Sequence, residues 1–590
     1  MSTFVHFFKL RGRIVGIALI GALNFGPPTL AGDWTMFGHD PARSGWANEE
    51  TKLSPRNVSD LRLLWKKHVN NQSYSLSALT APVAISNLLR DGTVRSTVYV
   101  AGIGGTVFSL DGETGEVLWT RSLRSMAMPG KGGFQGSFLC PNGITATPVI
   151  DRGSNTIYVI APDGGLNGLD LESGKIKYGP VPFVAPFTKN WSLNLVGGTV
   201  YTTVSLGCGN GRSGVYAADI RNVQRPLLRQ LFLSNAYTAG IWGRAGPVIG
   251  GNGKLYGGTA DGDTDPANGD YSDTVISASI EDLSLSDYFL PGNFAFLKKK
   301  DLDVASASPV WFAWKGRNLI ADGFKEGVLY LLDADRLGAQ DHDTPLFASP
   351  RLGNDLAECC GGAGIWGALS TSRDEEGQTW LYVPMGGPPS TQAPRFPITN
   401  GDNPHGSIMA FKVLSDPQTQ NPTLAPAWIS GDFHYPDPAA IANGVVFALS
   451  NGENPDQRGD ESRRLLNTRP AVLKALDAKT GKELYNSGAA VTTWAHFSGL
   501  AIANGRIYAV DHDSNVYCFG IPDRNAANRV PASRLKHDQD QLSSSWIGRA
   551  ERQEEFWAVW IKRAGGAAAL VILTAILGIC AGLKSQSKSD

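Results

Sequence analysis

The middle of the chain repeats a signature of strands and tight turns, and this repeat constrains the fold more than any other feature. Each copy has an alternating apolar strand, a Gly-rich turn, a second strand ending in Asp, a TG or SG turn, and an outer strand ending in Trp or Tyr. A repeat of this kind indicates the blades of a β-propeller rather than a helical solenoid. Clear copies read VYVAGIGGTVFSLDGETGEVLW at 98–119, IYVIAPDGGLNGLDLESGKIKY at 157–178 and VLKALDAKTGKELY at 472–485, with weaker copies at 199–220, 319–335, 381–413 and 507–519.

A second element precedes each copy and gives the number of blades. It is a short apolar strand, often introduced by Pro or Gly, and it recurs about every 45–70 residues, which is enough for four strands and their loops. The sequence therefore predicts an all-β fold, an eight-bladed β-propeller. The eight copies lie at 78–85, 143–150, 190–195, 240–249, 306–314, 364–370, 436–441 and 497–502.

The last repeat predicts how the ring closes. It ends after YCFG at 517–520 without an outer strand, whereas an orphan outer strand, LRLLWKKHV, lies at 61–69. We expect 61–69 to complete the eighth blade, because an open blade would expose a strand edge. A pair of packed β-sandwiches is the less favoured alternative, since sandwiches do not repeat at this period.

Composition agrees with a propeller and narrows the classes of function. The chain has 590 residues, of which 69 are Gly and 18% are charged, as expected for many short strands joined by tight turns. The formal net charge of −1 gives no sign of a nucleic-acid surface. No HExxH, Walker A or GxSxG sequence supports a hydrolase or a nucleotide-binding protein. The chain contains no CxxCH, so we expect no covalent c-type haem.

The two ends predict an exported protein with a membrane anchor. Residues 1–31 carry basic residues, the apolar run IVGIALIGAL and then TLA, the pattern of a secretory signal. An uncleaved anchor is less favoured, because this run is about half the length that spans a bilayer. Residues 564–583 are uncharged and would cross one hydrocarbon core as a helix. We therefore expect a propeller over 32–522 on the periplasmic face of the inner membrane, a polar stalk over 523–563, a transmembrane helix over 564–583 and a short tail over 584–590.

The cysteines leave two pairings open. Cys140 and Cys208 lie in loops of successive blades and either pair or stay reduced. Cys359 and Cys360 are adjacent, and form either a vicinal disulfide or two thiols in the loop CCGGAG. Cys518 in the last strand, and Cys580 in the membrane segment, are expected to be unpaired.

Three segments carry a resemblance to a known family. They are DWTMFGHDPARSGW at 33–46, GITATPVID at 143–151, and the stretch 240–280 that begins GIWGRAGPVI. Over roughly 33–520 the chain resembles the quinoprotein alcohol dehydrogenases, periplasmic eight-bladed propellers that hold pyrroloquinoline quinone (PQQ) and usually Ca²⁺ on the axis. The segment 301–335 is similar to the catalytic blade of that family.

The resemblance implies a set of site residues. Asp303 falls at the family's catalytic Asp, which takes the substrate hydroxyl proton as hydride moves to the quinone. Trp242 falls at the Trp beneath the quinone, where a flat ring stacks well. Lys325 stands where an Arg or Lys would stabilise negative charge on the reduced cofactor. Asp261 replaces a metal-binding Asn, and with Asp303 it offers carboxylate oxygens to Ca²⁺.

Other positions depart from the pattern of the family. Cys140 alone stands where the family has a vicinal cysteine pair near the cofactor, and Cys208 lies where a metal-binding Glu is expected. In the sixth blade, Ile365 replaces an Asn beside Trp366, which is the last of the implied cofactor contacts. The resemblance thus implies only two carboxylates for Ca²⁺, which takes six to eight oxygens.

Two classes of function stay open from the sequence. One is a membrane-tethered, PQQ-dependent oxidoreductase that oxidises a small alcohol or polyol and passes electrons to a separate acceptor. The other is a non-catalytic exported propeller that scaffolds envelope proteins, with the aspartates as turn formers, the lysine as a solvated cation and the tryptophans as blade core. An enzyme needs Trp, Asp and Lys to converge on the axis, whereas a scaffold does not.

Overall fold

The computed structural model describes residues 32–90, 93–125, 128, 130–359, 362–456, 458, 461–496 and 498–522. One compact unit, Met1–Ile521, contains every described strand, and Pro522–Asp590 forms a second unit. The predicted signal, stalk, transmembrane helix and tail lie outside the described residues. Within those described residues, no helix combines the length and hydrophobicity needed to cross a bilayer.

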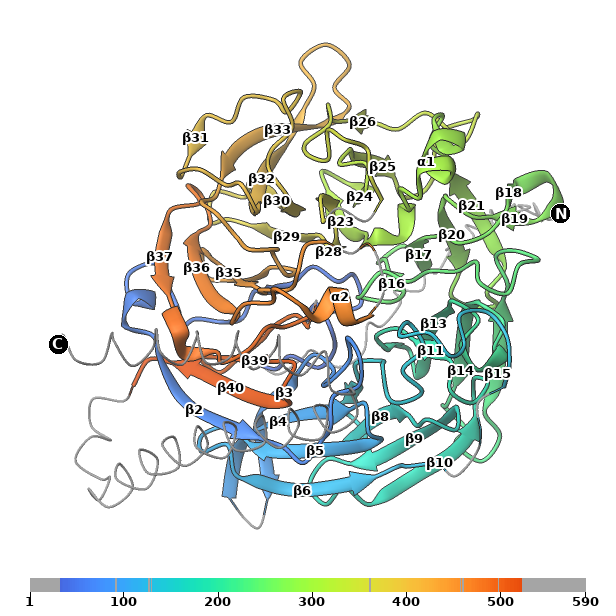
Figure 1. Cartoon of the computed structure of the whole chain (residues 1–590), viewed down its shortest axis with the longest axis vertical. Helices are drawn as coiled ribbons and strands as arrows, with labels where there is room; N and C mark the ends of the chain where they lie inside the picture. The colour runs from blue at the N-terminus through green and yellow to red at the C-terminus, as the bar shows by residue number, and fades with distance from the viewer. Residues whose placement is uncertain are drawn as a thin grey trace, which may run out of the picture. The chain divides into compact units, whose positions relative to one another are not determined.

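Eight sheets of four or more strands are arranged as blades around a central axis (Figure 1), and they are antiparallel except where β1 pairs with β34 and β31 with β33. Blade 1 consists of β3 (Val83–Arg90), β4 (Thr93–Gly102), β5 (Thr106–Asp111) and β6 (Val117–Ser122), and blade 2 of β7 (Val149–Asp151), β8 (Thr156–Ile160), β9 (Gly165–Asp170) and β10 (Ile176–Pro182). Blade 3 consists of β11 (Lys189–Asn190), β12 (Asn194–Val196), β13 (Thr199–Ser205), β14 (Gly214–Asp219) and β15 (Leu227–Leu231). Blade 4 consists of β16 (Val248–Ile249), β17 (Lys254–Gly258), β20 (Val275–Ser279) and β21 (Leu285–Phe289).

Blades 5 to 8 follow the same plan, with extra short strands in the sixth and seventh. Blade 5 consists of β23 (Val310–Trp314), β24 (Arg317–Gly323), β25 (Leu329–Asp333) and β26 (Phe347–Ala348), and blade 6 of β27 (Gly364–Ile365), β29 (Ser370–Arg373), β30 (Thr379–Gly386), β32 (Gly406–Ser415), β33 (Pro422–Ile429) and β31 (Ile398–Thr399). Blade 7 consists of β1 (Trp46–Ala47), β34 (Ala440–Ala442), β35 (Val445–Ser450), β36 (Val472–Asp477) and β37 (Glu483–Asn486). Blade 8 consists of β38 (Ala501–Ala503), β39 (Arg506–Val510), β40 (Asn515–Gly520) and β2 (Arg62–His68).

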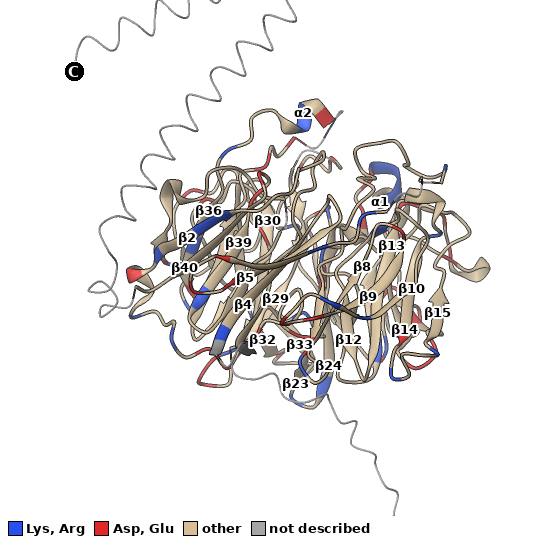
Figure 2. Ribbon diagram, turned by 90° about the horizontal axis from the view of Figure 1, so that it is seen from below, with Lys and Arg blue, Asp and Glu red and all other residues tan. Residues whose placement is uncertain are grey.

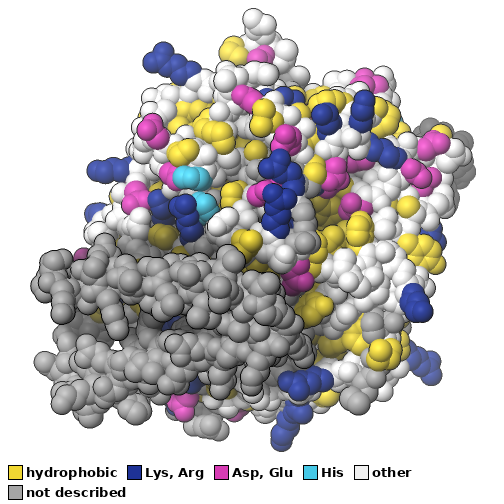
Figure 3. Space-filling view, viewed as in Figure 1, with side chains coloured by type: hydrophobic (Ala, Val, Ile, Leu, Met, Phe, Trp, Pro, Cys, Tyr) yellow, Lys and Arg dark blue, Asp and Glu magenta, His cyan; other side chains and the backbone are white. Residues whose placement is uncertain are grey.

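A few short elements lie outside the blades. The helices α1 (Phe294–Lys300) and α2 (Glu461–Leu465) project from the same face of the propeller (Figure 2). Acidic and basic side chains are intermingled on the face that Figure 3 shows, as the net charge near zero leads one to expect. The remaining elements are the hairpin β18 (Thr264–Asp265) and β19 (Asp270–Tyr271), the pair β22 (Ala307–Ser308) and β28 (Gly367–Ala368), and 3-10 turns at Val58–Asp60, Cys208–Asn210, Pro266–Asn268, Val304–Ser306 and Gly488–Ala490.

The predicted eight-bladed propeller and its closure are confirmed. Each predicted apolar strand overlaps the innermost strand of one blade. Strand β2, near the N-terminus, pairs antiparallel with β40, so that Trp65 lies opposite Cys518 and the eighth blade has no open outer edge. Apolar clusters fill the spaces between neighbouring blades, and the core is therefore distributed around the ring.

A contact between neighbouring blades explains the repeated turn and tryptophan. The indole N–H groups of Trp65 and Trp119 donate to turn carbonyls of the next blade, Gly112 at 3.1 Å and Leu171 at 3.0 Å. The glycine of that turn lies flat against the ring, because a Cβ on Gly115 would come within 2.6 Å of Trp65. The recurring Asp–TG–Trp signature therefore reflects the contact that each outer tryptophan makes with the turn of the next blade.

Residues 33–50, which we call the N-terminal plug, hydrogen-bond to blade after blade near the axis. Phe37 packs against Ala81, Ala245 and Ala368, which come from different sides of the ring, so its side chain lies near the axis. The plug reaches the eighth blade through Glu50, whose carboxylate accepts the N–H of Gly505 at 2.7 Å. Backbone bonds join Trp34 to Ala84, Thr35 to Ile150, Pro41 to Ile249, Ala42 to Trp311, Ser44 to Thr371 and Gly45 to Ile441.

Arg43 ties the plug to the third blade. Its guanidinium donates to the carbonyls of Phe37 at 2.6 Å and Leu193 at 2.9 Å, and burial lowers its pKa to about 9. We expect Arg43→Met to lower the free energy of unfolding by about 2–3 kcal/mol, because buried carbonyls lose their donor. Urea denaturation of the full chain measures this loss. Arg225→Met, at an exposed position, should change stability by less than about 0.5 kcal/mol, and an equal effect of both variants would contradict the plug's role.

Candidate functional site

A cavity of about 320 Å³ lies at the axis, where loops of blades on opposite sides of the ring meet. Apolar side chains of Phe134, Phe138, Leu139 and Leu206 form part of its wall. The predicted residues Trp242, Asp261, Asp303, Lys325 and Trp366 all line it. The ring therefore brings together five side chains that are up to 124 positions apart in the sequence.

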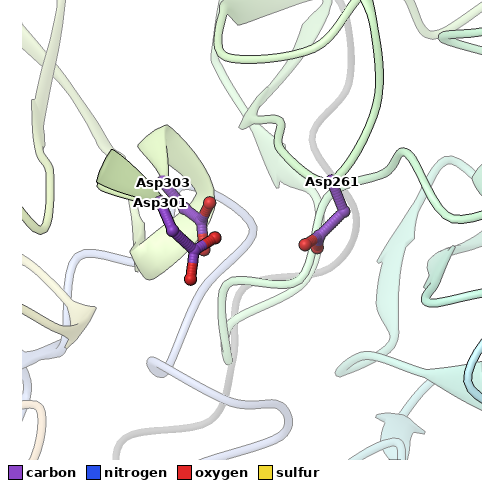
Figure 4. A group of neighbouring side chains, drawn as sticks. All are labelled: Asp261, Asp301 and Asp303. Carbon is purple, nitrogen blue, oxygen red and sulfur yellow. The ribbon is translucent and has the colours of Figure 1, made fainter. Parts of the chain in front are cut away.

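Three aspartates meet in this cavity (Figure 4). Asp261 follows β17, whereas Asp301 and Asp303 follow α1, and one oxygen of each lies within 4.8 Å of the others. Burial, reinforced by the charge of Asp303, raises the pKa of Asp261 well above its ordinary value. The Oδ2 atom of Asp261 is buried and has no hydrogen-bond partner among the described residues. This cluster is suited to a cation.

Lys325 is the cation already present beside the aspartates. Its Nζ donates to Oδ2 of Asp303 at 2.5 Å and to the backbone carbonyl of Asp301 at 3.3 Å. The side chains of Lys325 and Asp303 are only 5% and 9% exposed. Burial alone would lower the Lys325 pKa, but the charges of Asp303 and Asp301 raise it. Burial raises the pKa of Asp303 to about 6, and Lys325 offsets only part of that rise.

Two tryptophans lie next to this ion pair. The Nζ atom of Lys325 is 5.4 Å from the ring centre of Trp242 and 5.1 Å from that of Trp366. The two indoles are 6.1 Å apart and inclined by 48°. A flat ring held between two parallel rings needs about 7 Å, so a flat ligand would stack on one indole rather than between both. The Nε1 atom of Trp242 is buried without a partner among the described residues.

The cysteine pairing that the sequence left open is resolved for Cys140 and Cys208, which form a disulfide with a Cα–Cα distance of 5.5 Å. Neither cysteine lines the cavity, but both pack against Leu139 and Leu206, and these two leucines line it. The disulfide therefore joins two loops that carry the cavity wall, and direct contact with a cofactor stays a prediction. Cys518 is buried and unpaired, as expected, and Cys359 is disulfide-bonded. Cys360 and Cys580 lie outside the described residues.

Sequence reasoning missed two parts of the site. Asp301 supplies a third carboxylate, and its signal was the pattern Asp–Leu–Asp, which places two carboxylates one residue apart. The second part is basic and has no pattern in the sequence, since it comes from four distant segments. It consists of Lys189, Arg244, Arg464 and His496.

A second cavity, of about 350 Å³, shares the aspartate wall. Asp263 and Asp273 join the three aspartates there, and Lys298 pairs with Asp263 at 2.9 Å. Burial, with the charge of Asp303, raises the pKa of Asp273 to about 7. The aspartate cluster is therefore bordered by a strongly acidic space on one side and by the axial cavity on the other.

Comparisons with known proteins agree with the fold. Residues 56–236 match a family model for PQQ-type repeats, described as outer membrane protein assembly factor BamB. The quinohemoprotein alcohol dehydrogenase of Comamonas testosteroni is 15% identical, with 84% of this chain and 81% of that chain covered and a TM-score of 0.50. That of Pseudomonas putida HK5 is 12% identical, with 83% and 80% covered and a TM-score of 0.52. A europium-containing methanol dehydrogenase is 14% identical, with 83% and 98% covered and a TM-score of 0.50.

No curated protein matches the chain in sequence. The described residues form an eight-bladed propeller with a cavity on its axis. The resemblance to the quinoprotein alcohol dehydrogenases and to PQQ-like repeat proteins is thus confirmed. At such low identities the solved structures establish the shared fold, and the chemistry has to be argued from this chain's own residues.

Proposed function

We propose that the protein is a PQQ-dependent oxidoreductase that oxidises a small alcohol or polyol and passes the electrons to a separate acceptor. The observation that carries this proposal is the buried Asp303–Lys325 pair, which lies in one cavity with two further carboxylates and Trp242. A propeller that served only as a scaffold would have no need of buried charges on its axis, because burying them costs stability.

The residues present fit a flat, acidic quinone and a hard metal ion. The buried, unpartnered Oδ2 of Asp261 and Nε1 of Trp242 are the atoms that a bound group would satisfy. Carboxylate oxygens are the ligands that Ca²⁺ takes, and Asp301 adds to the two that the sequence indicated. Asp261, Asp301 and Asp303 would hold the metal, whereas the two indoles and Lys325 would contact the quinone.

The chain's own residues account for the rest of the chemistry. PQQ, when bound, supplies the carbonyl that accepts hydride. Asp303 would take the proton of the substrate hydroxyl as the general base. Lys325 holds the carboxylate of Asp303 in place and provides positive charge where negative charge would develop. Phe134, Phe138 and Leu206 give the cavity an apolar wall.

We also propose that the propeller is exported and held at the periplasmic face of the inner membrane. The signal-like residues 1–31 and the apolar run 564–583 support this placement. The disulfide between Cys140 and Cys208 is in keeping with an oxidising compartment. Protease treatment of spheroplasts, compared with that of lysed cells, measures the side of the membrane; a chain that is protected in spheroplasts and cut only after lysis would contradict export.

The proposed function is tested by titrating the full chain, purified in detergent, with PQQ in the presence and absence of Ca²⁺. We expect quenching of tryptophan fluorescence at micromolar PQQ, because Trp242 and Trp366 lie in the cavity. Reduction of an artificial dye by short alcohols should follow. If PQQ does not bind under either condition, the protein is not a PQQ-dependent dehydrogenase.

One observation favours a second candidate function. The family model that matches residues 56–236 is described as an outer membrane assembly factor, and such a protein would act by binding partners rather than by redox chemistry. Under this alternative the protein scaffolds envelope proteins and the axial cavity takes no quinone. The same titration separates the two candidates.

A further inference from the structure

Besides Lys325, four side chains of the axial cavity are basic, and the dehydrogenase chemistry proposed above uses none of these four. They come from β11, from the loop before β16, from α2 and from the loop before β38. We call them the basic pole, which comprises Lys189, Arg244, Arg464 and His496. The three aspartates lie in the wall of the same cavity.

A buried glutamate organises this pole. Glu453 is fully buried, and its Oε2 lies 2.7 Å from Nδ1 of His496, while its Oε1 lies 3.6 Å from Nη2 of Arg464. Arg244 in turn donates to the backbone carbonyl of His496 at 2.7 Å. One carboxylate thus holds two members of the pole, and the third is fixed to the backbone of the second.

Two members of the pole, Lys189 and Arg464, keep polar groups that no described residue pairs with or accepts from. Lys189 forms no ion pair with any described residue, and its nearest aromatic neighbour is Trp191 at 5.1 Å. Burial lowers the Lys189 pKa to about 7, and the charges of Arg244 and Arg464 contribute to that shift. The Nε atom of Arg464, a residue only 8% exposed, is buried without an acceptor among the described residues.

A lysine without an ion pair and a buried N–H group without an acceptor are unfavourable unless a ligand compensates them. We propose that the basic pole binds a carboxylate of the ligand that occupies the axial cavity. That carboxylate belongs either to the quinone cofactor or to a hydroxy-acid substrate whose hydroxyl group faces Asp303. The identity of the ligand rests on the proposed function, whereas the anion preference of the pole rests on its own residues.

The experiment compares Lys189→Met and Arg464→Met with the wild type, all as full chains in detergent. Lys298→Met serves as the matched control, because Lys298 lines the neighbouring acidic cavity instead. Binding is followed by tryptophan fluorescence with three probes: PQQ, its uncharged trimethyl ester, and citrate. Initial rates with glycerol and with glycerate are then measured at saturating PQQ.

If the pole holds the cofactor, each variant weakens PQQ binding at least tenfold, as loss of a charge-assisted hydrogen bond implies, and leaves binding of the trimethyl ester unchanged. If the pole holds the substrate, PQQ binding is kept and KM for glycerate alone rises at least tenfold. Citrate binding that disappears in both variants, in a protein that takes no PQQ, would support the pole and overturn the dehydrogenase.

Equal affinities of the variants and the wild type for every anion, with glycerate rates also equal, would overturn the inference even if alcohols are oxidised.

A measurement of stability shows whether a variant loses binding because it misfolds. Lys189→Met removes an unpaired cation, so its melting temperature without ligand should equal or exceed that of the wild type while anion binding is lost. A melting temperature well below wild type would show that Lys189 has a structural role and contradict the proposal.

Discussion

Asp303→Asn is expected to lower kcat/KM for alcohol oxidation by about 10²- to 10⁴-fold, the usual contribution of a general base. Asparagine has the same shape as aspartate but cannot take the hydroxyl proton. Lys325 can still donate to the amide oxygen, so the geometry of the pair is kept. Dye reduction by short alcohols at saturating PQQ and Ca²⁺ measures the loss.

The control for this variant is Asp263→Asn. Asp263 lies on the same acidic surface, is 79% exposed and pairs with Lys298, so it contributes charge without touching the axial cavity. Its activity should stay close to that of the wild type. If Asp303→Asn keeps full activity while binding PQQ normally, another group accepts the proton and the assignment of Asp303 is wrong.

The ring could be predicted from sequence because each blade is built by local rules. The TG turn and the outer tryptophan recur because Trp119 docks on the turn that ends at Gly174, and the same contact is repeated between other blades. The N-terminal plug was not predicted. Its backbone bonds go to six separate strands, and backbone bonding leaves no pattern in the side chains.

The site was predicted in part, and the division has a physical reason. Trp242, Asp303 and Lys325 were named from a family pattern, and the structure places all three in the lining of one cavity. The basic pole was missed because Lys189 and Arg464, 275 positions apart, become neighbours only through closure of the ring. A site formed by residues that are distant in the sequence cannot be predicted from the spacing of nearby residues.

Lys325→Met is expected to lower the free energy of unfolding by about 3–5 kcal/mol at pH 8, because it leaves the buried Asp303 without its cation. The loss should shrink at pH 5. In the wild type the folded-state pKa of Asp303, about 6, lies above the ordinary value of 3.8, so the folded chain holds this proton more tightly than the unfolded chain. The stability due to that difference is complete below about pH 4 and disappears as pH rises through 6.

Removing Lys325 raises the Asp303 pKa further, because the lysine opposes the effect of burial. At pH 5 the variant therefore buries a neutral carboxyl group, whereas at pH 8 it buries a bare charge. Urea denaturation of the ligand-free full chain at the two pH values measures the difference. Lys298→Met, which breaks the exposed pair with Asp263, should cost less than about 1 kcal/mol at either pH. A Lys325→Met loss that is the same at pH 5 and pH 8 would mean that the lysine stabilises the axis by packing against Trp242 and Trp366, and not by compensating the charge of Asp303.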